Sequence, residues 1–135
     1  MRGEGMQQTT LFAGSNMTAM ITIEPGAATT DRENPFNMTQ DDIEISDIEL
    51  HGMSGKHLPP GGATATYGIY AASITRSNFK NVAVKFLGVT TGAGVFLGFG
   101  WCNRIEDCDL SENAGVGLLL KFAANNINVI GSNIE

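Results

Sequence analysis

Ile45-Ser46-Asp47-Ile48-Glu49-Leu50 is the first copy of a six-residue pattern that recurs along the chain. Each copy opens with an aliphatic residue, has a small or aliphatic residue three positions later, and closes with an apolar residue two positions after that. The other copies are Ile74–Phe79, Ile105–Leu110 and Val129–Ile134, so the first residues lie 29, 31 and 24 residues apart. Self-similarity at this period indicates stacked units, because one unit cannot bury its apolar face alone. The sequence therefore predicts a solenoid.

The copies have the pattern of short β-strands interrupted by a bend. Their last three residues alternate apolar or small, polar, apolar, as in Ile48-Glu49-Leu50, which is the period of a strand with one buried face. The third position breaks the alternation and predicts a bend at Asp47, Arg76, Asp107 and Gly131. The chain contains 11 Asn and 17 Gly, residue types that tolerate the left-handed backbone of tight corners. We therefore expect strands and corners, with helix as a minor state.

A second set of strands is predicted between these copies. Three segments begin with glycine and continue with apolar residues: Gly68–Ala71, Gly94–Leu97 and Gly117–Leu120. Ala19–Ile23 resembles an earlier strand of this set. The register of this second set stays open, because Val82–Phe86 is an alternative strand for the same position in one coil. Continuous apolar runs suit strands that are buried on both faces, or on one face against an oligomeric partner.

The order of glycine, apolar strand, corner, six-residue pattern and Asn-rich corner resembles the right-handed parallel β-helix of the pectate-lyase-like superfamily. That group includes pectate lyases, polygalacturonases, alginate epimerases and phage tailspikes. The opening Arg2–Phe12, a Gly-x-Gly turn before a Thr-rich strand, is similar to early coils of its tailspike and lyase-like members. The resemblance covers nearly the whole chain. It implies an all-β, right-handed parallel β-helix (a single-stranded solenoid) associated with polysaccharides, and it is specific for fold rather than for function.

The length sets the domain organisation. Residues 1–135 make a single domain of about four coils, which is short for this fold, and no capping segment follows the last copy. Uncapped solenoid ends expose strand edges and apolar core. The chain is therefore expected to be either a piece of a longer polypeptide or a homo-oligomer, as a trimer or an end-to-end dimer.

Charge and hydropathy limit the partners. The net charge of −6 argues against a nucleic-acid-binding protein, which normally has a basic face. Met1–Phe12 has no apolar stretch of signal-peptide type, so an extracellular or virion-associated location is favoured without a visible signal. Phe86–Asn103 lacks charge but is broken by five glycines, which favours buried strands over a membrane span.

The cysteines and histidines predict no metal site. Cys108 occupies a small inward position of the six-residue pattern and is expected to be a buried thiol. A disulfide with Cys102 is the less favoured alternative to two reduced thiols. His51 and His57 lie in a predicted loop, without metal-ligand spacing to the other candidate ligands, and are interpreted as solvated.

Stacking the four copies in sequence register predicts two polar columns. One contains Glu49, Asn78, Asp109 and Asn133, and the other contains Asp47, Arg76, Asp107 and Gly131. Two coils separate Glu49 from Asp109, or about 9.6 Å at the usual interstrand spacing. That distance is near the upper end for the acid and base of an inverting glycoside hydrolase.

These columns suggest candidate catalytic residues Glu49, Asp107 and Asp109, with Arg76 and Asn78 contacting substrate. In a calcium-dependent lyase the same acids would bind Ca²⁺, and Arg76 or Lys80 would act as base. The alternative is a scaffold, because a cross-coil row of Asp and Arg is an ordinary way to pair charges on adjacent strands. Regular repetition favours this scaffold interpretation.

Aromatic side chains are candidate sugar platforms. Trp101 lies where a strand meets a corner, and Tyr70 lies on the preceding coil's equivalent strand. Sugar rings stack on such side chains, although each would equally fill a corner of the core. We therefore expect a carbohydrate-associated module that binds or processes an acidic polysaccharide. The alternative is a non-catalytic structural solenoid of a fibre, virion or surface appendage.

Overall fold

The computed structural model describes residues 9–24, 40–52 and 64–135. Of these residues, 64% lie in β-strands and none lies in a helix, so the fold is all-β. Every strand pair is parallel, and the two sheets do not close into a barrel. The prediction of an all-β fold with parallel strands is confirmed. The described part of the chain has no helix that is long and apolar enough to cross a membrane.

The seven-stranded sheet contains three of the four predicted copies of the six-residue pattern. Its main order is β1 (Thr10–Phe12), β4 (Glu44–His51), β6 (Asn78–Lys85), β8 (Arg104–Glu106) and β12 (Asn128–Ile130). Two short strands, β9 (Asp109–Leu110) and β13 (Asn133–Ile134), continue it: β9 pairs with β6, and β13 pairs with β9.

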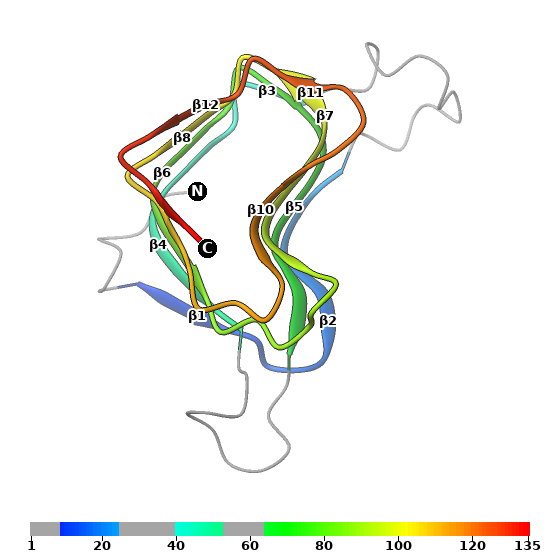
Figure 1. The fold of residues 1–135 in the computed structure, drawn as a ribbon, viewed down its shortest axis with the longest axis vertical. Coiled ribbons are helices and arrows are strands. Elements are labelled where there is room, and N and C mark those ends of the chain that lie inside the picture. The colour runs from blue at the N-terminus through cyan, green and yellow to red at the C-terminus, as the bar shows by residue number, and fades with distance from the viewer. Residues whose placement is uncertain (1–8, 25–39, 53–63) are drawn as a thin grey trace.

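The six-stranded sheet faces it across the core. Its main order is β2 (Met17–Ile23), β5 (Ala65–Thr75), β7 (Ala93–Trp101) and β10 (Val116–Leu120). The short strands β3 (Gln40–Asp41) and β11 (Ala124–Asn125) pair with β5 and β7 respectively. The chain passes back and forth between the two sheets, and Figure 1 shows successive passages lying behind one another in layers.

The core lies between the two sheets. The first, fourth and last positions of the four copies were predicted to point inward. Eight of the ten apolar residues at these positions are buried: Ile45, Ile48, Leu50, Ile74, Phe79, Ile105, Cys108 and Leu110. The other two, Val129 and Ile134, keep 43% and 37% of their surface exposed. They belong to β12 and β13, which are the last strands of their rows among the described residues. Their burial was predicted wrongly, because no other layer of the described residues covers them.

The register of the second copy differs from the prediction. Phe79, not Ile74, lies opposite Ile45 and Ile105, and Val82 lies opposite Ile48. The second copy in this sheet is therefore Phe79–Val84, and Val82–Phe86 belongs to this sheet. Ile74 lies near the end of β5, in the other sheet, where it pairs with Gln40. The two predicted polar columns are consequently wrong at Arg76 and Asn78.

Left-handed corners join the strands. Ten residues with φ between 50° and 62° form three rows. The first is Asp42, Arg76, Cys102 and Asn126, the second is Asp47, Asn81, Asp107 and Gly131, and the third is Phe86 and Glu112. The bends predicted from the sequence are therefore present, although Arg76 belongs to a different corner from Asp47 and Asp107. Asn and Asp adopt this conformation more readily than most residues.

The residue after a corner links one layer to the next. The Asn103 Oδ1 accepts a hydrogen bond from the Ser77 N–H at 3.0 Å, and its Nδ2 donates to the Ile74 carbonyl at 3.0 Å. Asn113 repeats the arrangement, accepting from the Leu87 N–H at 3.1 Å and donating to the Val84 carbonyl at 2.9 Å. Buried backbone groups at a corner need such partners, because the strand ladder is interrupted there.

Serine does the same at two other corners. The Ser77 Oγ accepts from the Ile43 N–H at 3.1 Å, and the Ser132 Oγ accepts from the Cys108 N–H at 3.0 Å. In all four cases the side chain of one layer binds the N–H of the previous layer at the matching position. We call these four side chains, Ser77, Asn103, Asn113 and Ser132, the corner caps.

Asn103→Ala should lower the free energy of unfolding by about 2–4 kcal/mol, because it leaves a buried N–H and a buried carbonyl without their partner. Asn103 is 1% exposed, so water cannot replace the amide without rearrangement. Asn125→Ala, the same change at an exposed position, is the control and should change stability by no more than about 0.5 kcal/mol. Urea unfolding of the three proteins measures both values, and equal losses would contradict the role of the cap.

Candidate functional site

Two of the predicted acids lie in one row on the seven-stranded sheet. Glu49 pairs with Ala83, and Ala83 pairs with Asp109, so the carboxylates are two strands apart. The usual interstrand distance places them about 9.6 Å apart. The predicted order of Glu49, a spacer and Asp109 therefore holds. The spacer is Ala83 rather than the predicted Asn78.

Lys85 occupies this face as well and binds one of the acids. Its Nζ lies 2.5 Å from Asp109 Oδ2, and both side chains are about one quarter exposed. The hydrogen bond to Asp109 raises the pKa of Lys85 against the opposing effect of burial, and the charges of Asp109, Glu112 and Glu49 add to the increase. A cation between carboxylates was predicted for Arg76, and Lys85 fills that role.

Asp109 is held as a carboxylate. Burial by itself would raise its pKa, but hydrogen bonds from Lys85, Ser111 and Asn133 outweigh burial and lower the pKa below its usual value. The Ser111 Oγ donates at 2.7 Å and the Asn133 Nδ2 donates at 3.2 Å. A general acid needs the opposite shift. Asp109 is thus suited to accept hydrogen bonds, and not to donate a proton.

Arg76 lies at a corner, away from Asp47 and Asp107. Its guanidinium binds Asp41 at 3.0 Å and Asp42 at 3.1 Å, and all three side chains are substantially exposed. The hydrogen bond to Asp42, followed by the charges of Asp41 and Asp42, raises the pKa of Arg76. In the row that was predicted for Arg76, Asn81 donates instead to Asp47 Oδ1 at 2.8 Å.

The remaining polar predictions are dispersed over the seven-stranded sheet. Asn78 lies opposite Glu44 and Arg104, in a different row from Glu49 and Asp109. Asp107 lies at a corner, where its carboxylate comes so near Gly131 that a Cβ there would lie 2.5 Å from Asp107 Oδ1. Asp107 and Asn78 therefore do not join Glu49 and Asp109 in one constellation.

Other charges on this sheet are paired, Lys80 with Glu106 between layers and Arg104 with Glu106 within β8. Glu106 accepts from Lys80 at 3.4 Å and from Arg104 at 3.1 Å. Lys80, the alternative base of a lyase, is thus part of a charge ladder. Among the described residues no group of three or more His, Cys, Asp or Glu side chains is arranged to hold a metal ion.

The two cysteines differ in their exposure to solvent. Cys108 is buried as predicted, and burial raises the pKa of its thiol. Cys102 is a free, exposed thiol at a left-handed corner, where its Sγ accepts from Asn126 Nδ2 at 3.3 Å.

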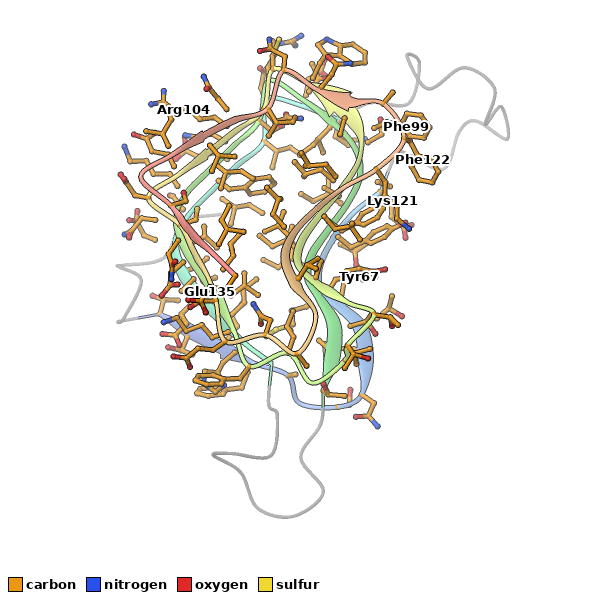
Figure 2. The ribbon with its side chains drawn as sticks, viewed as in Figure 1. Tyr67, Phe99, Arg104, Lys121, Phe122 and Glu135 are labelled. Atoms are coloured by element: carbon orange, nitrogen blue, oxygen red, sulfur yellow. The ribbon has the colours of Figure 1, made fainter. Side chains whose placement is uncertain are left out.

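The six-stranded sheet has aromatic side chains on its outer face. The rings of Tyr70 and Phe96, on adjacent strands, stack with centroids 4.6 Å apart and planes 4° from parallel. The Tyr67 ring packs against both in a tilted orientation, with centroids 5.3 and 5.5 Å away. Figure 2 shows Tyr67, Phe99 and Phe122 on the outer side of this sheet. We call Tyr67, Tyr70, Phe96, Phe99 and Phe122 the aromatic face.

A β-bulge interrupts the layered pattern at this face. Leu120 pairs with Leu97 and Ala124 pairs with Gly100, so three residues on one strand lie opposite two on the other. The extra length lies in Lys121–Ala123. Phe122 has φ 56°, is 77% exposed and stacks on Phe99 at 5.1 Å. Bulges often redirect a side chain next to a functional site.

The strands beneath the aromatic face are uncharged. No Asp, Glu, Lys or Arg occurs within the bounds of β2, β5, β7 or β10. The first charged residue after β10 is Lys121, in the bulge. The outer surface of this sheet is therefore suited to a ligand that makes apolar and hydrogen-bonding contacts.

The two predicted aromatic residues lie in this sheet, although only Tyr70 belongs to the aromatic face. Trp101 lies at the end of β7, beside the corner of Arg76, whose N–H donates to the Trp101 carbonyl at 3.1 Å. Both residues lie in the sheet opposite Glu49 and Asp109. The predicted acids and the predicted sugar platforms therefore do not form a single site.

The sequence prediction missed Phe96, Phe99, Lys121, Phe122 and Lys85. A signal for the bulge exists, because Gly94 to Arg104 spans 10 residues and the matching Gly117 to Asn128 spans 11.

Comparison of the chain with protein-family models, with curated proteins and with solved structures gave no match. A function for the chain is therefore inferred from the geometry of the two sheets.

The pairing of Asp109 predicts a pH-dependent contribution to stability. Because its pKa is lower in the folded chain than the ordinary value of 3.8, the contribution is present above about pH 4 and is lost as the pH falls through the lower, folded-state pKa. Asp109→Asn should therefore lower the free energy of unfolding on the order of 1 kcal/mol at pH 7, and much less near pH 2.

Thermal or urea unfolding between pH 2 and pH 7 measures this difference. The exposed Glu24→Gln, a matched change of carboxylate to amide, is the control and should show little effect at any pH. A penalty for Asp109→Asn that stays constant down to pH 2 would show that the carboxylate charge is not its source.

Proposed function

We propose that the chain is a right-handed parallel β-helix that binds glycans through the aromatic face. The β-helix is supported by the alternation of the chain between two parallel sheets and by the rows of left-handed corners. The right hand follows from the strong preference of crossover connections between parallel strands. The resemblance to the pectate-lyase-like superfamily, carried by the repeated pattern, supports the same fold.

The observation that carries glycan binding is the bulge that presents Phe122. A regular scaffold repeats its layers, whereas functional sites tend to interrupt them. The bulge adds one residue to a single layer and exposes a phenylalanine ring that packs on Phe99. Phe122 therefore has one ring face supported and the other open. An open, supported ring is what the apolar C–H face of a sugar needs for stacking.

Binding without catalysis fits the carboxylates better than hydrolysis or lyase chemistry. Asp109 is ionised and accepts three side-chain hydrogen bonds, and Lys85 is held protonated by the same contact. A lyase base would need a lowered pKa on its lysine. We therefore assign Glu49, Lys85 and Asp109 to the stability of the seven-stranded sheet.

The second candidate function is a structural solenoid of a fibre, virion or surface appendage. It is favoured by the cross-layer ion pair of Lys80 with Glu106 and by the corner caps, which make a regular scaffold. The two functions are compatible, because the aromatic face occupies only one sheet. Either function fits an extracellular or virion-associated location.

Phe122→Ala should weaken glycan binding about three- to tenfold, because it removes the open ring face. The test is an array of neutral and uronic-acid-containing oligosaccharides, followed by calorimetry on those that bind. Phe12→Ala is the matched control: Phe12 is also exposed, but it lies on β1 of the other sheet. Circular dichroism and melting of both variants show whether the fold is retained.

Equal affinities for the two variants, or no glycan binding by the parent chain, would contradict the proposal. The bound glycan should also remain intact on prolonged incubation. Release of reducing ends or unsaturated products that stops in Asp109→Asn would instead establish an enzyme, with its site on the seven-stranded sheet.

A further inference from the structure

The described residues expose large apolar side chains only in the first and last layers. Two of these side chains lie on β1, and the rest belong to the last layer, from β10 to β13. They are Leu11, Phe12, Val116, Leu120, Phe122, Val129, Ile130 and Ile134. Phe122 is turned outward by the bulge, but the others lie along strands at the two ends of the stack. In the described layers between them, no large apolar side chain is exposed to this extent.

In the seven-stranded sheet, the apolar residues of the first layer match those of the last layer. Leu11 lies opposite Leu50 in the first layer, and Ile134 lies opposite Leu110 in the last. Leu50 and Leu110 belong to one column, since Leu50 pairs with Val84 and Ala83 pairs with Asp109. A second copy placed on the last layer would therefore set Leu11 against Ile134, an aliphatic residue against an aliphatic one.

In the six-stranded sheet, the apolar residues of the first and last layers match as well. Ile21 pairs with Ile69, Ile69 with Val95 and Val95 with Leu118, so the first and last members of this column are both aliphatic. The neighbouring column ends in Ile23 and Leu120 by the same pairings. The apolar pattern of the first layer thus continues that of the last layer in both sheets.

The backbone edges at these ends also match. Among the described strands, β1 and β2 begin the two sheet orders, and β12 and β10 end them, so each has a described neighbour on one side only. All pairings are parallel, so a further parallel layer would satisfy the outer edges in the existing register. This continuity favours a second copy of the chain over a partner of unrelated shape.

We propose that the first layer of one copy stacks on the last layer of another, head to tail. The contact joins two different surfaces of the chain, so it is heterologous and repeats without closing. The product is an open filament whose layers continue from copy to copy. This inference does not depend on glycan binding, because the aromatic strands face sideways from the stack.

Two end-blocked variants test the proposal. The first is a double variant, Leu120→Lys and Ile134→Lys, which places charges on the last layer. The second is the double variant Leu11→Lys and Ile21→Lys, which places charges on the first layer. In sedimentation velocity the parent chain should form species that grow with concentration. Each variant alone should remain monomeric, whereas an equimolar mixture should form a dimer with 1:1 composition, through the one unblocked end of each.

The control is Ala72→Lys, which adds one lysine to β5, in a layer between the two ends, and should leave the concentration-dependent growth unchanged. Circular dichroism of every variant confirms that the strands are retained. A monomeric parent chain would overturn the proposal. So would a dimer formed by either blocked variant alone, which indicates like-to-like ends, or loss of assembly in Ala72→Lys, which indicates side-by-side association.

Discussion

The fold depends on the hydrogen bond that each corner cap makes to the backbone of the layer before it. A left-handed corner turns the chain sharply and interrupts the ladder of strand hydrogen bonds, so a buried N–H is left without a strand partner. Asn103, Asn113, Ser77 and Ser132 fill this need with a side-chain oxygen. An amide or hydroxyl at these positions therefore fixes the register of adjacent layers, and the apolar columns follow from that register.

The sequence predicted the parallel all-β fold well because burial and bending recur in it together. It predicted the register of the second copy wrongly for a specific reason. Corners of the first two rows lie five residues apart, as Arg76 and Asn81 show, and Ser77 and Val82 follow these two corners. The pattern of aliphatic, corner, small and apolar residues therefore fits Ile74–Phe79 as well as Phe79–Val84. Only the pairing of Phe79 with Ile45 and Ile105 distinguishes the two.

This error in the register of the second copy explains why the charged residues were placed incorrectly from the sequence. With Ile74 in the wrong sheet, Arg76 was placed between two acids, and Lys85, six residues after Phe79, was overlooked as the partner of Asp109. The aromatic face was missed for another reason. Its members come from β5, β7 and the bulge, and ring stacking between layers depends on a register that single-residue patterns do not determine.

The bulge at Lys121–Ala123 shows how the layers tolerate a change of length. Pairing is in register at Leu120 and again at Ala124, so the extra residue is accommodated between two fixed points and does not shift the strands that follow. Segments between fixed points are thus separable from the framework that carries them. A protein engineer would read the bulge as an acceptor position, where recognition loops of different length are exchangeable without redesign of the stack.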